Sequence, residues 1–172
     1  HGWVWFYRQL PNRAVDLTKE VLASKPAART EEVTLRTLAS HTSVAPGQEF
    51  QVALNFQIAD GWHICGPKKG ESYLPTMIEW ELPEGTALKA IQWPKPLLVN
   101  SGESVQPTYE GTITVLATFI APKDAKVNSK LKLAAKVNWQ ACRDLLCKLG
   151  DAKIETNIAV GTSTARESTS AK

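Results

Sequence analysis

The stretch LKLAAKVNWQACRDLLCKLG, residues 131–150, ends a regular β pattern with two cysteines. Polar or small residues alternate with the apolar side chains of Leu131, Leu133, Ala135, Val137 and Trp139, as in a strand with one buried face. A chain that turns back through residues 143–146 brings Cys142 and Cys147 within the roughly 4.4–6.8 Å between Cα atoms that a disulfide requires. They then meet either across a hairpin mouth or within one irregular turn, as a dithiol or a disulfide.

The same alternation with period two recurs along the chain from about Val33. It is found at 50–58, 77–82, 113–119 and 154–160, and turn residues separate the runs at 46–47, 83–85, 101–102, 122–124 and 150–151. Because no helical period interrupts this series, the sequence predicts an antiparallel β-sandwich. We expect one core that contains Phe50, Val52, Trp80, Phe119 and Trp139. The segments 61–75 and 94–109 are predicted to be long loops, which carry function more often than sheets do.

The two ends of the chain read differently from the middle. We expect residues 1–32 to form an N-terminal strap and linker, residues 33–161 one domain, and residues 162–172 a flexible tail rich in Ser, Thr and Ala. Residues 3–7 are an aromatic cluster, and Asn12 is a candidate cap for a short helix over 13–23. The cluster is either a juxtamembrane segment or a strap that packs on the domain.

Composition excludes several classes of function. The chain has 172 residues, 43% of them hydrophobic, and a net charge of +3 without a run of five like charges, so nothing points to nucleic acid. No stretch is long and apolar enough to span a membrane, and no leader pattern begins the sequence. The chain is therefore either cytosolic or a mature or excised piece. Three cysteines leave one thiol over from any internal bridge.

Several separate motifs carry a resemblance to a known family. The sequences GWHI (61–64), LPTMIEWELPEG (74–85), IQWPKP (91–96), YEG (109–111) and WQAC (139–142) occur in that order. Over residues 33–161 the chain resembles the N-terminal extracytoplasmic domain of DsbD-type thiol:disulfide interchange proteins, also described as a disulfide bond corrector domain. The resemblance implies an all-β, immunoglobulin-like antiparallel sandwich.

The resemblance also implies a function in disulfide exchange, with Cys142 and Cys147 as the catalytic pair. The segment 94–102 corresponds to the region that caps the site, and the flanking residues would be His63, Cys65, Trp139, Arg143 and Tyr109. The expected partners are thioredoxin-like redox proteins and a membrane electron-transfer domain, with no cofactor and no small-molecule substrate. The implied location is periplasmic or otherwise extracytoplasmic, within or tethered to a membrane protein, in processes such as cytochrome c biogenesis.

Three departures from the family pattern concern the site itself. The cysteines are spaced C-x4-C, Lys148-Leu149 replaces a common Ile-Pro, and Cys65 stands where a tyrosine is common. Either cysteine of the pair can be the attacking thiolate. Arg143 and Lys148 would lower a neighbouring thiol pKa and Asp144 would raise it, unless all three are solvated turn residues.

Two other classes of function remain open. Cys142 and Cys147 can form a purely structural bridge in a non-catalytic immunoglobulin-like binding module. Alternatively Cys65, His63, Cys142 and Cys147 together would suit a metal ion such as Cu(I) or Zn. Cys65 is expected to lie near the pair, and the alternative is that it is a small buried hydrophobe.

Overall fold

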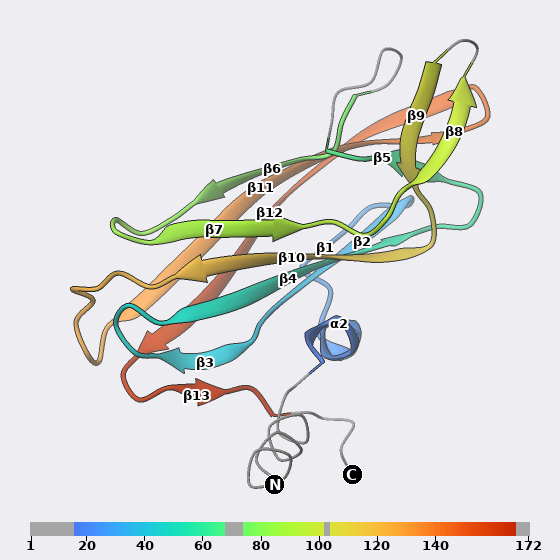
Figure 1. Ribbon diagram of the computed structural model, residues 1–172. Coiled ribbons are helices and arrows are strands. Elements are labelled where there is room, and N and C mark those ends of the chain that lie inside the picture. The colour runs from blue at the N-terminus through green and yellow to red at the C-terminus, as the bar shows by residue number, and fades with distance from the viewer. Residues whose placement is uncertain (1–15, 68–73, 102–103, 168–172) are drawn as a thin grey trace, which may run out of the picture.

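A computed structural model describes residues 16–67, 74–101 and 104–167 of the chain. These residues form two β-sheets packed face to face, which confirms the predicted immunoglobulin-like sandwich (Figure 1). The first sheet has the strand order β1-β2-β4-β10-β7. Its strands are β1 (Ala28–Arg29), β2 (Val33–Ala39), β4 (Glu49–Ile58), β10 (Thr112–Ile120) and β7 (Ala87–Gln92).

The second sheet carries the cysteines and has the order β13-β3-β12-β11-β5-β9-β8, with β6 also paired to β11. The pairing is antiparallel except where β12 runs parallel to β3. Its strands are β3 (His41–Val44), β5 (His63–Cys65), β6 (Met77–Glu81), β8 (Leu97–Ser101), β9 (Ser104–Tyr109), β11 (Lys130–Arg143), β12 (Leu146–Val160) and β13 (Thr164–Ala165).

The interior is divided into two clusters, so the prediction of one shared core is wrong in detail. Trp139 belongs to a cluster with Phe56, Ile64 and Tyr109. Phe50, Val52 and Phe119 belong to a second one. Trp80 is half-buried, packs against both, and meets the edge of Phe119 with ring centroids 4.9 Å apart. The tryptophan therefore links the two halves of the interior.

The hairpin of β11 and β12 is longer than the sequence pattern predicts. Its register runs without interruption from Lys130 opposite Ala159 to Arg143 opposite Leu146. Gly150-Asp151 is therefore not a turn, because both residues lie inside β12. Trp139 lies directly opposite Gly150, and a Cβ added to this glycine would overlap the indole ring. Glycine here marks the close approach of a side chain, which sequence alone does not distinguish from a turn.

Both predicted long loops also contain strands. The segment 61–75 includes β5, and the segment 94–109 forms the β8–β9 hairpin. Each of these strands has only three to six residues, too few for the alternation to stand out. β1 lies in the predicted linker and β13 in the predicted tail, and both hydrogen-bond to a neighbouring strand.

The helix that precedes the first strand is short. It consists of α2 (Leu17–Glu20) and a 3-10 turn, η1 (Val21–Ala23). Asp16 caps α2, because its side chain accepts a hydrogen bond from the backbone N–H of Thr18 in the first turn. Leu17 and Val21 pack on Ala53 of β4. The predicted Asn12 cap and the aromatic cluster lie outside the described residues. Figure 1 shows α2 away from the end of the molecule where the β11–β12 turn and the β8–β9 hairpin lie.

Candidate disulfide-exchange site

The two cysteines of the pair lie opposite each other at the closed end of the β11–β12 hairpin. Cys142 is the register partner of Cys147, their Cα atoms are 4.1 Å apart, and their sulfurs form a disulfide. Residues at such a non-hydrogen-bonded position approach most closely in an antiparallel pair. Only Asp144 and Leu145 remain in the turn, and Asp144 has a φ of 53°. Of the two expected geometries, the structure has the bridge across a hairpin mouth.

The two sulfur-bearing residues differ in exposure. Cys142 is 1% exposed, whereas Cys147 is half-buried. The side chains around Cys147 in the sequence are apolar and exposed: Leu145, Leu146 and Leu149 are 102%, 49% and 72% exposed. Cys147 is therefore the more accessible cysteine of the bridge. By alternation Leu149 shares its face of β12, whereas Leu146 points to the opposite face and Leu145 lies in the turn.

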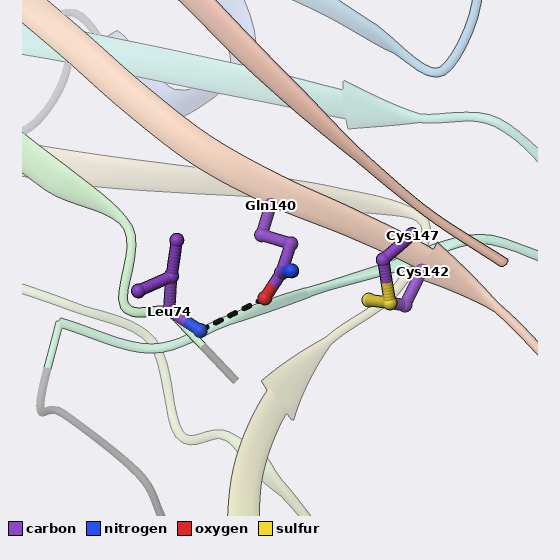
Figure 2. The surroundings of a disulfide bond; sticks show 4 residues. All are labelled: Leu74, Gln140, Cys142 and Cys147. Carbon is purple, nitrogen blue, oxygen red and sulfur yellow. Dashed lines mark hydrogen bonds between the residues drawn. A yellow bond between two sulfur atoms is a disulfide. The ribbon is translucent and has the colours of Figure 1, made fainter. Parts of the chain in front are cut away.

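A groove of about 490 Å³ lies along the same face of the hairpin. Side chains alternate across a strand, so Gln140 and Cys142 share the face of β11 that points away from the first sheet; Figure 2 shows both on one side of the ribbon. The Gln140 Oε1 atom accepts a 2.8 Å hydrogen bond from the backbone N–H of Leu74, which holds the segment before β6 against β11. The apolar residues that line the groove are Leu74, Pro75, Met77, Trp139 and Leu149.

His63 and Cys65 are placed by β5, which pairs with β11. His63 is the register partner of Cys142 and is half-buried. Cys65 lies two residues further along β5, on the same face by alternation, and is 1% exposed. Burial raises the pKa of the Cys65 thiol to about 11. Cys65 thus shares a sheet face with the pair, but at neutral pH it is a protonated, enclosed thiol, a poor nucleophile.

This environment predicts a pH dependence that belongs to Cys65 alone. The pKa of the thiol is near its ordinary value of 9.0 in the unfolded chain and about 11 in the folded one, so the unfolded chain loses its proton first. The stability that this difference contributes is complete below pH 9 and declines as pH rises towards 11. Urea unfolding from pH 8 to pH 11 is expected to show a steeper loss of stability in the wild type than in Cys65→Ala. Equal slopes would show that the thiol is not protected by burial.

The other predicted flanking residues have different surroundings. Trp139 lies in the core over Gly150, three residues before Cys142. Tyr109 is buried in β9, which is separated from β11 by β5, and donates a 2.7 Å hydrogen bond to the carbonyl of Pro94. Burial raises its pKa. Arg143 is exposed, with its guanidinium 4.9 Å from the ring centroid of Trp62.

The segment 94–102 reaches the same end of the sheet as the disulfide. The segment contains β8, which pairs with β9, and β9 in turn pairs with β5. His63 of β5 lies opposite Cys142. Gly102 lies outside the described residues. That this segment shields the disulfide stays a prediction.

No group of three or more His, Cys, Asp or Glu side chains is arranged to hold a metal ion among residues 16–67, 74–101 and 104–167. His63, Cys65 and the oxidised pair therefore do not form a ligand set in this structure. Within those same ranges, no helix is long and apolar enough to cross a membrane.

Two parts of the site are not apparent from the sequence. Trp62 belongs to the GWHI motif, but only the structure shows that cations from both arms of the hairpin lie against its buried ring. Leu149 departs from the family pattern, but the sequence does not show that it lies beside the bridge. Its position does contain a signal: Leu149 lies two residues after Cys147 in the same strand, so the two side chains share a face.

The family described as "Thiol:disulfide interchange protein DsbD, N-terminal" matches residues 31–159. No curated protein matches. The chain is similar to the N-terminal periplasmic domain of ScsB from Proteus mirabilis, with 17% identity and a TM-score of 0.51. That match covers 73% of this chain and 46% of the ScsB chain, so this chain spans less than half of the ScsB chain.

Two structures from Neisseria meningitidis are also similar. The reduced DsbD N-terminal domain has 17% identity and a TM-score of 0.43, with 77% of this chain and 90% of that chain covered. The DsbD N-terminal domain in its complex with the PilB N-terminal domain has 15% identity and a TM-score of 0.45, with 77% and 89% covered. Because the family match spans well over half of the sequence and includes the cysteine hairpin, the chain belongs to the family of DsbD N-terminal thiol:disulfide interchange domains.

Proposed function

We propose that this domain exchanges disulfides with thioredoxin-like proteins through Cys142 and Cys147, in an extracytoplasmic compartment. The observation that carries the proposal is the bridge itself: two directly opposed cysteines at the end of a hairpin, of which Cys147 is half-buried and has exposed leucines near it in the sequence. A buried structural bridge needs no such approach. A five-residue separation also closes a very short loop, which gives little entropic stabilisation.

The difference in exposure supports Cys147 as the attacking residue and Cys142 as the resolving one. In the reduced domain the half-buried Cys147 thiolate attacks a disulfide of the partner, a mixed disulfide forms, and one partner thiolate leaves. The enclosed Cys142 then attacks Cys147, which closes the intramolecular bridge and releases the second partner thiolate. Two electrons pass to the partner. A second redox module then reduces the Cys142–Cys147 bridge by the reverse steps and supplies two new electrons. A membrane electron-transfer domain is the expected origin of these electrons.

Thiol counting tests this function against its alternatives. We expect two alkylatable thiols to be lost from the reduced domain and two to be gained by an oxidised thioredoxin-like protein, with the same result when a chelator is present. A bridge that resists both partner and mild reductant would identify a structural disulfide. Exchange only after metal removal would instead identify a soft-metal site.

The exposed apolar side chains near Cys147, above all Leu149 on the same face, are the expected docking surface for the partner. Exposed apolar side chains that surround a reactive group commonly mark an interface. Leu149→Asp places a charge beside the groove on the Cys147 face, and we expect the rate of exchange with the partner to fall about tenfold, the cost of losing a typical interface anchor. The equilibrium of the pair with glutathione is expected to stay unchanged, because glutathione needs no extended surface.

Val127→Asp is the matched control. Val127 is 62% exposed and lies before β11, at the end of that strand far from Cys142. This variant is expected to exchange at the wild-type rate. Equal losses in Leu149→Asp and Val127→Asp would mean that general surface charge, not docking beside the bridge, slows the reaction.

A further inference from the structure

The side chain of Trp62 contacts both arms of the cysteine hairpin on the face opposite the disulfide. The residue comes directly before β5, and its ring is packed in the core with 7% of the residue exposed. The Cζ atom of Arg143 lies 4.9 Å from the centroid of this ring, and the Nζ atom of Lys148 lies 5.8 Å from it. Both distances are within the range of a cation–π interaction. One aromatic side chain thus contacts a cation from each arm.

Each of these cations directly follows one cysteine of the pair. Arg143 follows Cys142 in β11, and Lys148 follows Cys147 in β12. Neighbouring residues of a strand point to opposite faces, so the cations project to the face away from the disulfide. Trp62 therefore contacts both arms without covering the sulfurs.

Further contacts fix the two cations. A Cβ at Gly61 would lie 3.4 Å from Cδ of Arg143, so the arginine stem runs close over this glycine, whose φ is +84°. The Nζ atom of Lys148 is 3.5 Å from Oε2 of Glu31 and 3.9 Å from Oε1 of Glu32, in the segment that enters β2 of the first sheet. The hairpin end is thereby tied to both sheets by side chains that do not depend on the S–S bond.

We propose that Trp62 is a positioning residue that keeps Cys142 and Cys147 opposed when the pair is reduced, and so favours closure of the disulfide. The inference rests on the proposed exchange function. Closing the bridge costs less entropy when both thiols are already held in register. Because the contact favours the oxidised state, oxidation must in turn strengthen the contact.

The glutathione equilibrium measures this effect directly. The reduced pair and one oxidised glutathione give the Cys142–Cys147 disulfide and two reduced glutathiones, so two electrons leave the domain. We expect Trp62→Leu, which keeps an apolar side chain but removes the π face, to lower this equilibrium constant about tenfold. For a two-electron couple, tenfold corresponds to a reduction potential about 30 mV less negative. Trp62→Phe keeps a weaker aromatic face and should restore part of the difference.

Two further variants separate positioning from general loosening of the core. Trp93→Leu is the matched control, because Trp93 packs against the same cluster and stacks on Phe56 and Tyr109; its equilibrium constant should equal that of the wild type. In a chain that carries Arg143→Gln and Lys148→Gln, Trp62→Leu should cause no additional shift. These two charge substitutions at exposed positions test the same contact should Trp62→Leu not fold.

An unchanged equilibrium constant in both Trp62→Leu and the double charge variant would overturn the inference. So would an equal shift in Trp93→Leu, or an undiminished shift when the cations are absent. No partner protein takes part in this measurement. Failure of exchange with a thioredoxin-like protein is therefore a separate result, and it would count against the proposed function alone.

Discussion

Replacing Cys142 with serine is expected to trap the domain in a covalent complex with its partner. The half-exposed Cys147 can still attack the partner disulfide, but no second thiol is opposed to it to resolve the mixed disulfide. Cys147→Ser is expected to do the opposite, because the remaining thiol of Cys142 is 1% exposed and cannot meet a folded partner. Non-reducing electrophoresis should show a stable complex for Cys142→Ser and almost none for Cys147→Ser. Turnover should be abolished in both.

Cys65→Ser is the control for this pair of variants. Its thiol is as enclosed as that of Cys142, and burial holds its pKa at about 11, so its loss should leave exchange at the wild-type rate. A stable complex formed by Cys147→Ser in place of Cys142→Ser would reverse the assignment of attacker and resolver. A change in exchange rate in Cys65→Ser would show that the third thiol competes for the mixed disulfide.

The strands that the sequence predicts well are those with one buried face over many residues. The expected runs at 50–58 and 113–119 fall inside β4 and β10. β10 alternates in burial over its nine residues, whereas in β4 the alternation of apolar and polar residue types is clear in the sequence although residues 52–56 are all buried. β5 and β8 have three and five residues, and β8 has exposed apolar side chains where a one-sided strand would alternate. Such strands are fixed by their neighbours in the sheet, and this information is not local in sequence.

The site divides in the same way. The chemistry and spacing of the cysteine pair are visible in the sequence, whereas the role of Trp62 depends on which side chains lie across from it. The resemblance points to His63 as a flanking residue, and only the register shows that it lies opposite Cys142. The direction of approach could not be predicted either, since it depends on the unequal burial of two cysteines in one hairpin.

The glycine at position 150 lies inside β12, directly opposite Trp139. Trp139 is 3% exposed, and its indole occupies the space where a side chain of the opposite residue would stand. A Cβ at position 150 would lie 2.5 Å from Cζ2 of Trp139 and closer still to Cε2 and Nε1. Neither side can relax easily, because the contact is with a rigid ring packed in the core rather than with the end of a flexible chain.

Gly150→Ala is therefore expected to lower the free energy of unfolding by about 3 kcal/mol, at the upper end of what overpacking usually costs. Urea unfolding of the oxidised domain would measure this loss. The second-site change Trp139→Leu removes the ring. In a Trp139→Leu chain, Gly150→Ala should therefore lower the free energy of unfolding by less than about 1 kcal/mol. This dependence of one substitution on the other identifies the clash between the two residues. Similar costs in both backgrounds would mean that the glycine is required by the backbone and not by the tryptophan.

Because Trp139 and Gly150 are three residues from Cys142 and Cys147, a displaced indole should also separate the hairpin arms, and the glutathione equilibrium of Gly150→Ala is expected to shift towards the dithiol.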